Sequence, residues 1–120
     1  MTAKKASTPE FDFDGFDEAA ALADSADALG LKFAFGGGVF AGRFRDGEVV
    51  SLPLDVPRKI VDGVDLEGLD PFEQVTAILK ALDLGDRADK LVEQGLVSSL
   101  LFAQKYFTTI EKVMKVSLGE

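Results

Sequence analysis

The chain of 120 residues contains no cysteine, no histidine and no tryptophan. The absence of cysteine excludes disulfide bonds and thiolate chemistry. The absence of histidine removes the usual proton shuttle at neutral pH, the commonest metal ligand and the base of the common serine triad. The composition therefore favours a protein that is not an enzyme, and we expect no catalytic residue, no metal ligand and no bound cofactor.

Basic residues are also few: 13 lysines and arginines stand against 21 aspartates and glutamates, which gives a net charge of −8. A nucleic-acid surface needs clustered lysines and arginines, and the sequence has no such cluster, so we expect no nucleic-acid partner. The longest apolar run, around Leu100–Ala103, is far too short to cross a membrane. The first nine residues lack the apolar core of a signal peptide. A cytosolic protein without a membrane partner is therefore expected.

The N-terminal part of the chain interleaves acidic and aromatic side chains. Asp14 is the predicted N-cap of a helix that ends near Leu29. Phe11, Phe13 and Phe16 lie just before this helix and in its first turn. Two interpretations of these side chains are open: either their rings fold back on the helical body as a hydrophobic staple, or they dock on a partner.

Three short strands are predicted between residues 31 and 52, because large and small apolar residues alternate there, with turn signals between them. The turns are the glycine run 36–38 and the dipeptide Asp46-Gly47, which is a strong hairpin signal. The glycine run also fits the dinucleotide-binding pattern GxGxxA. A dinucleotide site needs a helix after the glycines, and here a strand is predicted, so we interpret the run as a turn.

Helices are predicted from Pro57 onward. Asp70, Pro71 and Glu73 together form a strong start signal. The predicted boundaries of the three main helices are Asp70 to Gly85, Asp86 to Gly95, and Ser98 to about Ser117. A small sheet needs helices on one face for stability. The predicted fold is therefore α+β and mainly α, with a small antiparallel β meander packed against a bundle of amphipathic helices. We expect residues 1–14 to be a flexible acidic-aromatic arm and residues 15–120 to be a single domain.

The last helix has an apolar arc of about 160°, wider than the roughly 100° that a surface helix needs. One edge of such an arc can pack on the body and the other on another chain. The candidate partner-binding residues are Phe102, Tyr106, Phe107, Ile110, Val113 and Met114.

Charge is unevenly distributed along the chain. Residues 98–117 carry three lysines against Glu111 alone, whereas residues 10–27 carry seven acids and no base. The basic helix can therefore orient against its own acidic region or against an acidic neighbour. Salt limits the reach of such attraction to about 8 Å.

The predicted elements follow a distinct order: a short hairpin, then Leu52-Pro53, then acidic amphipathic helices, and a closing helix that leads into Ser117-Leu118-Gly119-Glu120. This order resembles that of the tail assembly chaperones of long-tailed, siphovirus-type phages of actinobacteria. The resemblance covers roughly residues 30–120, in order and proportion. In that family the short form often ends close to such a sequence, where a ribosomal frameshift produces a longer form. The resemblance therefore predicts a frameshift at Gly119-Glu120, and the alternative is a plain glycine C-cap.

The resemblance implies binding without catalysis. A tail assembly chaperone binds the tape measure protein in the host cytoplasm and keeps its apolar helices soluble during tail assembly. The tail tube protein is a further expected partner, and self-association is a further alternative. A different class of function also stays open: a small structural or adaptor protein that remains in the virion and binds a neighbouring subunit through its C-terminal helix.

Overall fold

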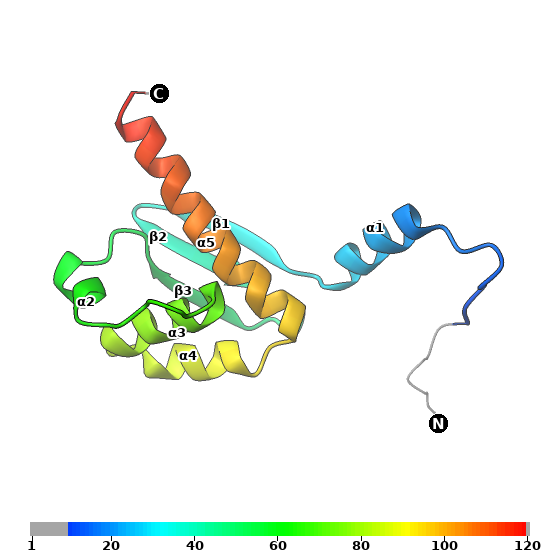
Figure 1. Cartoon of the computed structure of the whole chain (residues 1–120), viewed down its shortest axis with the longest axis horizontal. Helices are drawn as coiled ribbons and strands as arrows, with labels where there is room; N and C mark the ends of the chain where they lie inside the picture. The colour runs from blue at the N-terminus through cyan, green and yellow to red at the C-terminus, as the bar shows by residue number, and fades with distance from the viewer. Residues whose placement is uncertain (1–9, 120) are drawn as a thin grey trace.

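The computed structural model of the chain describes residues 10–119. These residues form five helices and a three-stranded antiparallel sheet of order β1-β2-β3, so the predicted mainly-α α+β fold is confirmed (Figure 1). Residues 1–9 of the predicted arm, and Glu120 of the predicted frameshift site, lie outside the described residues. The elements in chain order are α1 (Glu18–Ala28), β1 (Lys32–Gly36), β2 (Val39–Arg43), β3 (Val49–Pro53), α2 (Arg58–Asp62), α3 (Pro71–Ala81), α4 (Gly85–Val92) and α5 (Leu96–Ser117).

Both predicted hairpin turns are present. Gly36 pairs with Val39, so β1 and β2 are joined by the two residues Gly37 and Gly38, with φ of 60° and 83°. Positive φ at both central positions is what the tightest hairpins require, and glycine adopts it without a steric penalty. Because β2 and not a helix follows these glycines, the backbone offers no dinucleotide-binding turn here. The Asp46-Gly47 turn joins β2 to β3, as predicted.

The predicted start of α3 is also confirmed. The Asp70 carboxylate accepts a hydrogen bond from the Glu73 backbone N–H at 2.8 Å, and the Glu73 carboxylate accepts one from the Asp70 N–H at 3.1 Å. This reciprocal capping box satisfies donors that a helix start would otherwise leave unpaired.

Other predicted helix boundaries are wrong by a few residues. α3 ends before Gly85, since Asp83 takes the left-handed conformation (φ 65°) and reverses the chain. Gly85 instead begins α4, whose N-cap Leu84 makes no side-chain hydrogen bond, so Asp86 is a first-turn acid and not the cap. α5 begins at Leu96, slightly earlier than predicted.

The core lies between one face of the sheet and the helices α3, α4 and α5. Figure 1 shows α5 crossing that face diagonally, with α3 and α4 beside it. Phe40 of β2 makes edge-to-face contacts with Phe102 and Tyr106 of α5, at ring-centroid distances of 5.4 and 5.6 Å. On α4, Arg87 donates hydrogen bonds to the backbone and side-chain oxygens of Ser51, at 2.9 and 3.2 Å, and so ties this helix to β3. The fully buried aliphatic side chains around this centre are Val50, Leu52, Val75, Leu79 and Leu91.

α1 stands outside this core. It is capped by Asp17, not by Asp14, and none of its residues is buried. A hydrogen bond of 3.1 Å from Arg45 Nη1 to the Ala28 carbonyl holds its C-terminal end beside the β2–β3 turn. Figure 1 shows α1 pointing away from the sheet, on the side opposite the C-terminal end of α5. The packed body therefore begins near Leu31, because no residue of α1 is buried and its Leu22 side chain is 63% exposed.

Candidate functional site

The structure divides the predicted partner-binding residues of α5 into three groups. Phe102 and Tyr106 are fully buried, so their assignment to a partner-binding surface is wrong for this fold. The reason is that the first half of α5 lies on the sheet. Tyr106 also donates a hydrogen bond of 2.6 Å to the Pro53 carbonyl, and burial raises the pKa of its phenol to about 12. Both residues hold the fold together.

Phe107 and Ile110 form the second group. Both are half-buried against the core, and the Phe107 ring packs edge-on against Tyr106 with centroids 5.1 Å apart. They also line a shallow hollow of about 240 Å³ with Val61 and Leu66, on the side of α5 that faces α2. Their exposed edges can extend a binding surface, but most of their apolar area is already used.

Val113 and Met114 form the third group, and their side chains are 39% and 53% exposed. The C-terminal turns of α5 reach beyond the edge of the body (Figure 1). The wide apolar arc is thus explained differently from what the sequence suggested. In the first half of α5, Phe102, Ala103 and Tyr106 are buried in the core that the helix forms with the sheet and α3. The exposed apolar side chains of the helix lie towards its two ends: Leu96, Val97 and Leu101 near the start, and Val113, Met114 and Val116 near the end.

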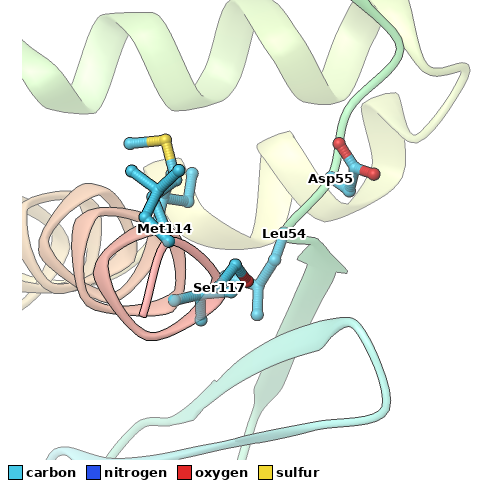
Figure 2. A pocket seen from close by; sticks show the side chains of 7 residues that line it. Leu54, Asp55, Met114 and Ser117 are labelled. Atoms are coloured by element: carbon cyan, nitrogen blue, oxygen red, sulfur yellow. The ribbon is translucent and has the colours of Figure 1, made fainter. Parts of the chain in front are cut away.

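A groove of about 410 Å³ lies beside this helix end; we call it the Leu54 groove. Figure 2 shows Met114 and Ser117 projecting from α5, and Leu54 and Asp55 on the segment after β3 that faces the helix. The Asp55 carboxylate points away from the Leu54 side chain. The remaining lining residues are Ile110, Val113 and Leu118. An apolar floor with a single acid at its rim suits the apolar face of a helix.

A second hollow, of about 310 Å³, lies on the other side of α5, towards β1. It is lined by Phe35 of β1, which is 56% exposed, and by Lys112, Val113, Val116 and Ser117 of α5. Sequence reasoning missed Leu54, Phe35 and Val116 as surface residues. Phe35 lies on the face of the sheet that packs against the core. It stays exposed because α5 crosses the sheet beside it and does not cover it.

The charges around α5 differ between its two sides. Asp55 lies at the Leu54 groove, whereas the β1 side carries Lys112 and, nearer the helix start, Lys105. The Lys105 ammonium lies 6.0 Å from the centroid of the Phe33 ring. Within residues 10–119, neither lysine forms an ion pair. The basic character predicted for this helix is therefore available to a partner on the β1 side.

One acidic side chain of the described residues, that of Asp46, is held by two hydrogen bonds. Asp46 has a pKa below its ordinary value because its carboxylate accepts hydrogen bonds from the Glu48 backbone N–H and the Gln94 side chain. That arrangement secures the β2–β3 turn. Between residues 10 and 119, no three metal-ligating side chains are grouped closely enough to hold a metal ion. No helix in the same range is long and apolar enough to span a membrane.

Comparison of the chain with protein-family models, with curated proteins and with solved structures finds no match.

Proposed function

We propose that this chain is a non-catalytic tail assembly chaperone that binds and solubilises the tape measure protein of a long-tailed phage in the host cytoplasm. The observation that supports this proposal best is the exposed apolar end of α5. Val113 and Met114 are exposed there, and the Leu54 groove lies beside them. Exposed apolar surface bordered by polar groups is typical of an interaction site.

The groove has the properties that transient binding of apolar helices requires. Its partly exposed Met114 has a flexible, polarisable side chain, which adapts to different partner surfaces. A surface of this size supports contacts that are weak one at a time, so many copies can cover a long helical partner and still be released. The net charge of −8 then keeps the covered partner in solution by mutual repulsion.

A longer, frameshifted product would carry the same body. In the described chain Gly119 has a φ of 81° and its N–H bonds to the Val116 carbonyl, which is the geometry of an ordinary helix C-cap. The backbone thus supports the plain capping role and is equally compatible with continuation of the chain. Sequencing of the codons for residues 117–120 and of the overlapping frame tests the frameshift directly.

Co-expression tests the main proposal. The chain is produced together with the tape measure protein encoded beside it, and the soluble fraction of the tape measure protein is measured. We expect a several-fold increase over expression without the chain. Met114→Glu places a charge on the apolar surface and should abolish most of the gain. Val92→Glu is the matched control, because Val92 is also exposed (61%) but lies on α4.

Unchanged solubility of the tape measure protein with the wild-type chain would contradict the proposal. Loss of the gain with Val92→Glu as well as Met114→Glu would contradict the assignment of the site. Mass spectrometry of purified virions separates a chaperone, which should be absent from the particle, from an adaptor protein that remains in it.

A further inference from the structure

The seam between β1 and α5 carries a second surface, which shares only Val113 and Ser117 with the Leu54 groove. Two hollows follow each other along it: one of about 280 Å³ at Phe33 and Lys105, and one of about 310 Å³ at Phe35 and Lys112. We call them together the β1–α5 groove. Its lining combines apolar side chains and lysines and includes no aspartate or glutamate among the described residues. A ligand that suits it is both apolar and acidic.

The chain itself contains a segment of that chemistry. Residues 10–17, which we call the acidic segment, alternate acids with Phe11, Phe13 and Phe16 and contain no base. The three phenylalanine side chains are 64%, 84% and 65% exposed. Three such rings in water are unfavourable, because burial of an aromatic side chain against apolar surface is favoured over its exposure.

We propose that the acidic segment of one copy docks in the β1–α5 groove of a second copy. Within one copy, the Arg45–Ala28 hydrogen bond holds α1 at the end of the body opposite the C-terminal turns of α5. The acidic segment is thereby presented outward, away from its own groove (Figure 1). A neighbouring copy can meet both surfaces without rearrangement of the packed body.

The dimensions of the two surfaces agree. The two hollows are centred ~15 Å apart along α5 at a helical rise of about 1.5 Å per residue. In the structure the segment is bent, since the Gly15 N–H donates a hydrogen bond to the Asp12 carboxylate at 3.0 Å and the Phe11 and Phe13 rings lie 6.0 Å apart. Docking opens this exposed turn, and the extended segment then places Phe11 and Phe16 up to ~17 Å apart. One ring can therefore enter each hollow, while Asp12 and Asp14 between them face Lys105 and Lys112. The Leu54 groove is the poorer site for this segment, because Asp55 repels it.

Such a contact is heterologous, because one copy contributes its acidic segment and the other contributes its β1–α5 groove. It leaves a free segment at one end and a free groove at the other, so association grows with concentration unless the copies close into a ring or a reciprocal pair. The inference concerns the purified chain alone and does not depend on the proposed chaperone function.

Light scattering after size exclusion, over a range of protein concentrations, tests the inference on the full chain. The wild type should exceed the monomer mass of 12.8 kDa as concentration rises. Lys105→Glu with Lys112→Glu, or Asp12→Lys with Asp14→Lys, should each weaken association by about tenfold or more, because two charge pairs become repulsive. The matched controls are Lys59→Glu with Lys80→Glu and Asp24→Lys with Asp27→Lys, which make the same charge changes elsewhere and should associate like the wild type.

A mixture of the two test variants gives the sharper result. The groove variant keeps its acidic segment and the segment variant keeps its groove, so the wild-type interface can form between them. The lysines of the segment variant also face the glutamates of the groove variant, so the second interface between the two is attractive as well. We expect the mixture to associate with increasing concentration, although each variant alone stays monomeric. A wild type that is monomeric at all concentrations, variants that associate like the wild type, or a mixture that stays monomeric would each overturn the inference.

Discussion

The ring of Phe102 lies directly on the backbone of Gly42, where β2 passes under α5. A Cβ atom at Gly42 would stand 2.5 Å from Cδ2 and 2.7 Å from Cε2 of that ring. No real Cβ contact is that short, so the position requires a residue without a side chain. The close approach lets Phe102 contact Phe40 and Phe44 together and brings α5 down onto the sheet.

Gly42→Ala should destabilise the protein by about 1–3 kcal/mol, because the Phe102 ring cannot leave its fully buried site without shifting the helix. Urea denaturation followed by circular dichroism measures the change. Gly36→Ala is the matched control: Gly36 is also in the sheet, has open space where a Cβ would stand and should change stability by less than ~0.5 kcal/mol. Equal effects of the two substitutions would contradict the close contact.

Substitutions along α5 should separate its packed half from its exposed end. Phe102→Leu removes ring contacts in a full core and should cost about 1–3 kcal/mol. Met114→Ala should stay within ~0.5 kcal/mol, since its side chain is half in solvent. The same urea titration measures both. A large loss with Met114→Ala would mean that the end of α5 is packed and not free.

Stability should fall at high pH because of Tyr106. Its pKa of about 12 in the folded state exceeds the ordinary value of 10.0, owing to burial. The contribution is therefore fully present below pH 10.0 and is lost as pH rises towards 12, by roughly 2–3 kcal/mol if burial alone acts. Because the chain has one tyrosine and no tryptophan, ultraviolet absorbance of the tyrosinate reports its titration directly.

Tyr106→Phe provides the control for that pH dependence. It removes the titrating group and the hydrogen bond to Pro53, so it should cost about 1 kcal/mol at neutral pH. Its stability should then decline less steeply than the wild type's between pH 10 and 12. A wild-type titration at the ordinary pKa would show that the phenol is in contact with water.

Asp70→Ala should destabilise the protein by about 0.5–2 kcal/mol, because it removes the N-cap of α3 and half of the capping box. Asp62→Ala is the comparison. It removes only an exposed ion pair of 3.8 Å to Arg58, which contributes about 0–1 kcal/mol. Thermal unfolding distinguishes the two. Equal melting temperatures for both variants would contradict the reciprocal hydrogen bonds at the start of α3.

Features that depend on a few neighbouring residues could be predicted from the sequence. The Gly37-Gly38 and Asp46-Gly47 turns require particular backbone angles, and the cap at Asp70 requires particular side-chain oxygens. Such requirements act over three or four residues, so the local pattern was sufficient. The three-stranded meander and the mainly helical remainder followed from them. Asp83 shows where prediction from the local sequence fails. Its left-handed conformation could not be recognised from the neighbouring residues, and it ends α3 before the predicted residue, Gly85.

Which side chains are free depends on the tertiary structure. A helical period shows that Phe102 and Met114 belong to one wide apolar arc, but it cannot show where the sheet beneath the helix ends. Phe102 is buried because Gly42 lies under it, and Met114 is exposed because α5 continues past the body. In the same way, α1 was predictable as a helix but not as an element outside the core. Burial is set by contacts between segments far apart in the chain, and those contacts exist only in the folded molecule.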